Sequence, residues 1–169
     1  MKHTRLLSAA LTVLFLSGCS SPDQPPASSD RTPAELTDLY SSAISAHGGD
    51  MVEANPVVTQ LTPDTAPLLE YMGLSDENMI AFAASTSMMN VKAYGIAAVM
   101  PAPGSEEAVK AALQNFIDRQ IMSFEFYLPD QREIAKNARL ETLTDGTVLL
   151  VMTEHQDAVF DNIAQAIQS

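Results

Sequence analysis

The segment 91–100 (VKAYGIAAVM) restricts the fold more than any other part of the chain. Its residues are mostly apolar and β-permissive, and Pro101-Ala102-Pro103-Gly104 follows directly. A short apolar run bounded by turn residues is typical of a strand that is buried on both faces. No run of about 18 or more apolar residues occurs in the sequence, so no segment is predicted to span a membrane permanently. We therefore expect a domain built around a sheet.

The residues after this strand predict two clear helices. Apolar positions keep helical spacing from Ser105 to Leu128, and Pro129 ends the pattern. The residues 130–136 add a short helical turn. A last helix begins near Gln156 and places an apolar stripe along one of its sides.

A β-hairpin is predicted between these helices. The segments 139–143 and 147–153 have strand patterns, and Asp145-Gly146 lies in the connection, where it favours a type I′ turn. Strand, helix, hairpin and helix in this order predict an α+β fold. We expect a small, mainly antiparallel sheet of about three strands, with a C-terminal hairpin, packed against several helices on one of its faces.

Three further helices are predicted before the strand. The first covers 35–44, and the second runs within 62–73 and closes at Gly73. The third is predicted after 75–78, a run of capping and acidic residues, and would carry Met79, Ile80, Phe82 and Ala83 on its inner side. The pattern leaves open whether 51–61 adds a strand.

The residues 1–18 predict a secretory signal peptide. Lys2 and Arg5 form a short cationic region, and the apolar stretch 6–16 follows. At about 1.5 Å per residue, this stretch is too short to cross about 30 Å of hydrocarbon. A cationic start followed by a short apolar stretch is typical of an export signal.

The signal ends in Leu16-Ser17-Gly18-Cys19, which resembles the lipobox of bacterial lipoprotein precursors. The resemblance implies that the sulfur of Cys19 receives diacylglycerol and that cleavage makes Cys19 the first mature residue. Two acyl chains give stable anchoring. Because the chain has one cysteine, lipidation leaves none for catalysis or for a disulfide. The alternative is a secreted protein whose cysteine lies beside the cleavage site by chance.

The mature chain is predicted to consist of a tether and one acidic domain. The residues 19–34 are rich in proline and serine and favour a disordered tether, so 35–169 form a single globular domain. Loss of Lys2 and Arg5 leaves seven basic residues against 21 acidic ones, a net charge of −14. Such a chain repels phosphate backbones and anionic headgroups, which argues against nucleic acid as a partner.

Met88, Met89 and Asn90 form the candidate partner surface, together with the edge of the segment 91–100. Thioethers bind copper(I), but adjacent methionines point to opposite faces of a strand. We therefore expect Met88 and Met89 chiefly to pack in the core, with Asn90 bonding locally.

No recognisable catalytic or metal-binding set occurs in the sequence. The mature chain has two histidines, His47 and His155, whereas a zinc site needs about three or four ligands, and no His-x-x-x-His motif or cysteine pair occurs. No Gly-x-Ser-x-Gly elbow and no glycine-rich phosphate loop occur either. We therefore predict no catalytic residue, no metal and no cofactor. The alternative is a small envelope hydrolase that uses carboxylates and His155.

Several segments, taken in order, resemble one family of proteins. They are MGL at 72–74, MMNVKA at 88–93, SFE and YLPDQ within 123–131, and the hairpin with Asp145-Gly146 and VLLV at 148–151. Together the residues 75–154 resemble a family of bacterial lipoproteins, domain-of-unknown-function family 4358. The resemblance implies an envelope lipoprotein without an assigned activity, and it carries no catalytic residues over.

These observations predict a membrane-anchored, extracytoplasmic lipoprotein that serves as a non-enzymatic binding or accessory module of the cell envelope. Diacylglycerol on Cys19 would hold it on the outer face of the cytoplasmic membrane, or at the outer membrane of a cell that has one. An envelope protein is the expected partner.

Overall fold

The computed structural model describes residues 31–169, so the predicted signal peptide, Cys19 and most of the predicted tether lie outside the described residues. This part of the chain forms ten elements: α1 (Pro33–His47), α2 (Met51–Ala54), α3 (Ala66–Met72), β1 (Met79–Thr86), β2 (Gly95–Pro101), α4 (Glu106–Phe124), α5 (Pro129–Lys136), β3 (Arg139–Thr142), β4 (Val148–Met152) and α6 (Gln156–Ile167). Within residues 31–169, none of these helices is long and apolar enough to cross a membrane.

The strands form one antiparallel sheet in the order β1-β2-β4-β3. The predicted α+β class and the C-terminal hairpin are therefore confirmed, with four strands rather than about three. The strand predicted over 91–100 is β2, which starts at Gly95 and is buried on both faces for most of its length.

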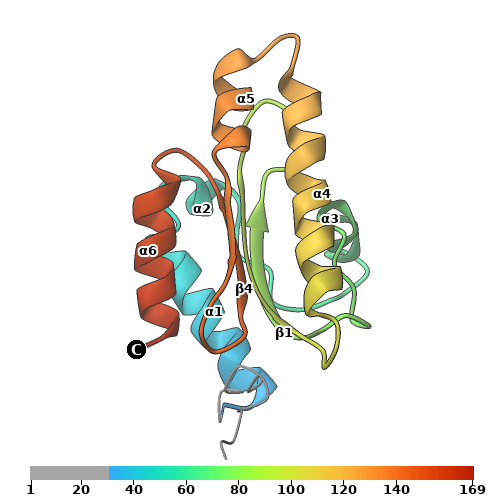
Figure 1. Ribbon diagram of the computed structural model, residues 1–169, viewed down its shortest axis with the longest axis vertical. Coiled ribbons are helices and arrows are strands. Elements are labelled where there is room, and N and C mark those ends of the chain that lie inside the picture. Colours follow the sequence, from blue (N-terminus) through green and yellow to red (C-terminus); the bar gives the residue numbers. More distant parts are fainter. Residues whose placement is uncertain (1–30) are drawn as a thin grey trace, which may run out of the picture.

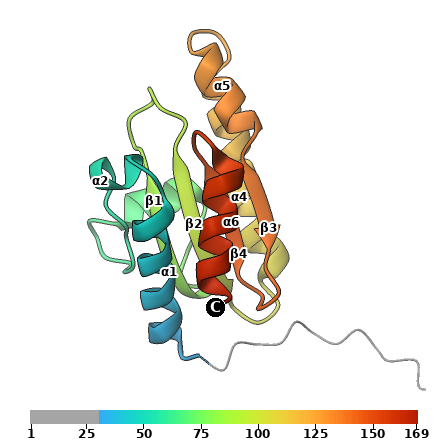
Figure 2. The same ribbon diagram turned by 90° about the vertical axis from the view of Figure 1, so that its left-hand side faces the viewer.

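Helices cover both faces of the sheet, whereas the sequence led us to expect them on one face. Figure 1 shows α1 and α6 on one side of the strands and α3 and α4 on the other; Figure 2 shows the face that carries α1 and α6. Side chains alternate along each strand, so Phe82 and Leu150 pack towards α4, while Ala83 and Leu149 pack towards α1 and α6. A strand buried on both faces requires a helical layer on each side, and this requirement sets the architecture.

The prediction of a helix after 75–78 is wrong, because residues 75–78 form a turn that leads into β1. The amide of Asn78 donates to the carbonyl of Ser75 at 3.2 Å, and the Asn78 side chain accepts from the Ser75 amide at 3.2 Å. The run Met79–Thr86 pairs with β2 apart from a register shift between Met79 and Ala81. Periodicity alone does not separate a short, fully buried strand from a helix, and pairing with β2 decides between them here.

The hairpin has a different turn from the predicted type I′. Only Gly146 has a positive φ there, at 90°, while a type I′ turn needs two such residues. The Gly146 amide donates to the carbonyl of Leu143 at 3.0 Å, and the Leu143 amide donates to the carbonyl of Thr147 at 2.8 Å. The connection is therefore a longer loop in which the glycine takes the left-handed position.

Helix boundaries differ from the predictions at two points. α1 starts at Pro33, inside the predicted tether, because Thr32 and Glu35 form a capping box. α4 ends at Phe124 rather than at Leu128, and a short connection leads to α5. The sequence pattern does not decide whether 51–61 adds a strand. In the structure this segment holds α2 and a single bridge between Val58 and Ala84.

Candidate functional site

Two loops place six exposed apolar side chains at one end of the molecule, here called the apolar end. Met88, Met89 and Val91 belong to the β1–β2 loop, while Met122, Phe126 and Tyr127 belong to the end of α4 and its connection to α5. Phe126 is 91% exposed, Met89 71% and Met122 70%. Both loops lie at the same end of the fold in Figures 1 and 2.

Asn90 holds the two loops of the apolar end together. Its side-chain amide donates to the Tyr127 hydroxyl at 2.7 Å, and the same hydroxyl donates to the Asn90 carbonyl at 3.3 Å. The Ser123 hydroxyl donates to Oδ1 of Asn90 at 3.0 Å. Asn90 therefore bonds across the two loops, and the expected local bonding is wrong.

The prediction that Met88 and Met89 pack in the core is also wrong. Met88 is 56% exposed and Met89 is 71% exposed. β1 ends at Thr86 and β2 begins at Gly95, so both methionines lie in the loop beyond the strands, where no helix covers them. Their place in the predicted partner surface stays a prediction.

Met122, Phe126 and Tyr127 are not part of the predicted partner surface. The apolar spacing continues to Leu128 and so predicts a helix over 125–127, but in the structure these residues lie outside α4. The aromatic pair Phe126-Tyr127 just before a proline is the signal that was available. Tyr127 lies against the buried ring of Phe124, with 6.4 Å between ring centroids, so its ring is partly anchored.

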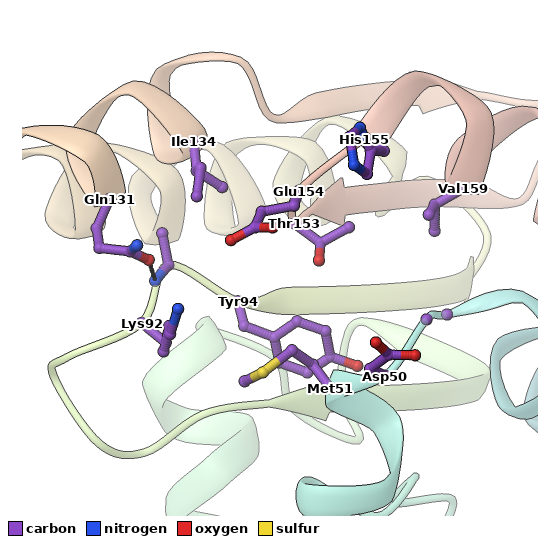
Figure 3. Close-up of a pocket in the computed structure, with 13 residues that line it drawn as sticks. Asp50, Met51, Lys92, Tyr94, Gln131, Ile134, Thr153, Glu154, His155 and Val159 are labelled. Carbon is purple, nitrogen blue, oxygen red and sulfur yellow. Dashed lines mark hydrogen bonds between the residues drawn. The ribbon is translucent and has the colours of Figure 1, made fainter.

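A pocket of about 430 Å³ lies near the same end, where β4 leads into α6. Its other walls are formed by the chain after α1, by the segment before β2 and by α5. Figure 3 shows Lys92 on the side of Gln131 and Asp50 on the side of Val159, with Thr153, Glu154 and Tyr94 between them. A volume of this size is within the range of small-molecule sites, about 300–1,000 Å³.

The pocket floor is fixed by buried hydrogen bonds. The Ala93 amide donates to Oε1 of the buried Gln131 at 2.9 Å, which ties α5 to the segment before β2. The hydroxyls of Tyr94 and Ser85 lie 2.9 Å apart. Burial raises the pKa of Tyr94 above its usual value, so the hydroxyl is neutral at physiological pH.

The candidate catalytic groups lie near one another without forming a known catalytic arrangement. His155 and Glu154 line the pocket together with Asp50, whereas His47 does not. His155 has a φ of 58°, the left-handed region, at the start of α6. Within residues 31–169, no group of three or more metal-ligating side chains gathers in one place.

Comparison with known proteins gives one match. The model of a family described as a domain of unknown function (DUF4358) matches residues 57–153, more than half of the chain. The matched stretch runs from the Val58 bridge to the end of β4 and includes both loops of the apolar end. No curated protein and no solved structure matches.

Proposed function

Since the chain belongs to the DUF4358 family, whose function is unknown, we propose from its exposed side chains that it is a lipid-anchored, extracytoplasmic binding module. In this proposal it docks a protein of the cell envelope through its apolar end. The observation that carries the proposal is the set of six exposed apolar side chains at this end. They lie on the β1–β2 loop and on the end of α4 with its connection to α5, which Asn90 ties together.

The chemistry of the apolar end is that of a protein interface. Aromatic and methionine side chains are enriched at the energetic centres of interfaces, and soluble domains rarely gather exposed apolar groups without a partner. Asn90 already holds the two loops against each other, so a partner meets a partly preorganised surface.

The sequence supports anchoring at the opposite end of the domain. The chain enters the fold at α1, and α1 begins at the end away from both loops of the apolar end (Figures 1 and 2). With diacylglycerol on Cys19 and the residues up to Thr32 as a flexible tether, the apolar end would be free to reach a partner above the membrane. We place the protein on the outer face of the cytoplasmic membrane, or at the outer membrane of a cell that has one.

The charge of the domain selects the kind of partner. Residues 31–169 carry seven basic and 19 acidic side chains, so the domain as a whole is strongly acidic. Beside the apolar loops the charges are mixed: Glu125 lies 3.8 Å from Arg132, and Asp130 lies near Lys92. A second copy of this chain or an anionic membrane would be repelled by the net charge of the domain. We therefore propose a protein partner that presents apolar side chains surrounded by lysine and arginine.

The test is cross-linking of the full-length protein in its native cells, followed by identification of the cross-linked peptides by mass spectrometry. Phe126→Ser should abolish the main envelope cross-link, and Met88→Ser with Met89→Ser should weaken it strongly. Ile80→Ser is the matched control, because Ile80 is an exposed apolar residue, 47% accessible, on β1 near the other end of the sheet. Cys19→Ala should shift the protein out of the membrane fraction.

Equal loss of the cross-link in Ile80→Ser and Phe126→Ser would overturn the apolar end as the binding surface. A partner peptide without basic residues would contradict the proposed charge pairing, as would binding that salt does not weaken. A Cys19→Ala protein that stays in the membrane fraction would remove the lipid anchor from the proposal.

The alternative proposal is a small envelope hydrolase that uses carboxylates and His155. The observation in its favour is that His155, Glu154 and Asp50 line one pocket. A hydrolytic activity that His155→Ala abolishes in a folded protein would establish it, while an activity unchanged by this substitution would remove His155 from the mechanism.

A further inference from the structure

The pocket beside α6 is lined by a hydroxyl group that can bond a ligand. Thr153 is 7% exposed, and within residues 31–169 its hydroxyl makes no hydrogen bond to another residue. Figure 3 shows the hydroxyl directed into the space between Thr153 and Tyr94. The hydroxyl is accessible from the pocket, because Arg132 Nε is the one buried side-chain nitrogen or oxygen without a partner among residues 31–169. It is therefore free to bond a molecule that enters the pocket.

Charges of both signs stand on the pocket wall without being paired to each other. Lys92 lies on one side and Asp50 on the other, with Thr153 between them. Among the described residues neither Lys92 nor Asp50 forms an ion pair within 4.0 Å. Lys92 is close enough to Asp130 to help lower the pKa of that carboxyl, after the larger effect of the hydrogen bond from Gln131.

We infer that this pocket binds a small zwitterion, a short peptide with a free ammonium and a free carboxylate. Lys92 would meet the carboxylate, Asp50 the ammonium, and the Thr153 hydroxyl a peptide group between them. Tyr94 and the apolar side chains of Ile134 and Val159 would contact the rest of the ligand.

The distribution of charge favours a zwitterion over a simple ion. A simple anion near Lys92 would leave Asp50 without a partner, and a simple cation near Asp50 would leave Lys92 unused. One molecule with both charges, separated by a neutral chain, satisfies both sides of the pocket and the hydroxyl between them. This inference is independent of the apolar end, which contributes none of these groups.

The experiment is calorimetric titration of the purified full-length protein in detergent with alanyl-alanine. Two analogues of the dipeptide each lack one charge: one has an acetylated amine and the other an amidated carboxylate. We expect each block to weaken binding at least about tenfold, because each removes one charge pair. Thr153→Val, which keeps the shape of the side chain, should weaken binding of the free dipeptide.

Two variants test which residue binds each charged end of the dipeptide. In Lys92→Met, amidation of the ligand should no longer weaken binding, and in Asp50→Asn, acetylation should no longer do so. Lys110→Met and Asp64→Asn are the controls, since both residues lie outside the pocket and leave the pattern unchanged.

Absence of binding at millimolar dipeptide overturns the inference, and so does an analogue that binds as well as the free dipeptide. Blocking effects that persist in Lys92→Met and Asp50→Asn would do the same. Phe126→Ser should bind the dipeptide normally, so this result is separate from the test of the partner surface.

Discussion

The Tyr40 hydroxyl lies 2.6 Å from Oγ1 of Thr147, although 107 positions separate the two residues along the chain. Both residues are fully buried. Thr147 Oγ1 donates to the carboxylate of Asp145 at 2.9 Å, so the Tyr40 hydroxyl is the donor in the pair. This chain of hydrogen bonds joins α1 to the turn of the C-terminal hairpin.

Thr147→Val should destabilise the protein more than Tyr40→Phe. The valine leaves the Tyr40 hydroxyl buried without an acceptor, at a cost of about 1–3 kcal/mol, whereas the phenylalanine removes one hydrogen bond worth about 1 kcal/mol. Urea denaturation of the full chain measures both free energies of unfolding. The reverse order would contradict the assignment of Tyr40 as donor.

Stability should fall at high pH because Tyr40 stays neutral in the folded state. Burial raises the pKa of Tyr40 above its usual value of 10.0, and the hydrogen bond with Thr147 and nearby charges change this only partly. Above pH 10.0 the unfolded state loses this proton while the folded state keeps it, so the free energy of unfolding decreases. The difference in stability between the wild type and Tyr40→Phe should therefore shrink as the pH rises through this value. A constant difference would contradict the shift.

Gly95→Ala should destabilise the protein by about 1–3 kcal/mol through overpacking. A Cβ atom at Gly95 would lie 2.7 Å from Cε1 of Phe116, a fully buried ring of α4. Combining Gly95→Ala with Phe116→Leu should recover part of the loss, and a double-mutant cycle in urea measures that coupling. Strictly additive effects would show that the ring does not limit this position.

His155→Gly should give a more stable protein than His155→Ala, by about 1 kcal/mol. The left-handed conformation at φ 58° has a steric free-energy cost for alanine, as it has for histidine, because both carry a Cβ atom. Glycine adopts this conformation without that cost. Thermal unfolding of the two variants at the same pH measures the difference. Equal stabilities would mean that the backbone relaxes at this position.

Asn90→Ala should loosen the apolar end and leave the global stability nearly unchanged. The substitution removes the hydrogen bonds of the side chain with Tyr127 and Ser123, both at the surface. Hydrogen exchange followed by mass spectrometry should show faster exchange in 88–91 and 125–128 and unchanged exchange in the strands. Unchanged exchange in both loops would show that Asn90 does not hold them.

The sequence by itself determined the elements whose signals are local. The proline and glycine residues around β2 and the spacing of the apolar residues in α6 specify where those elements lie, because each signal depends on neighbours within a few residues. A local pattern of the same kind predicted Met88, Met89 and Asn90 as a candidate partner surface.

Tertiary structure decided what depends on distant residues. The alanine-rich run of β1 becomes a strand because β2 pairs with it, and the two helical layers follow from burial of three strands on both faces. Asn90 reaches Tyr127 across 37 positions, and Lys92, Thr153 and Asp50 meet at one pocket. No local pattern encodes such contacts, since they arise when separate elements pack against a common sheet.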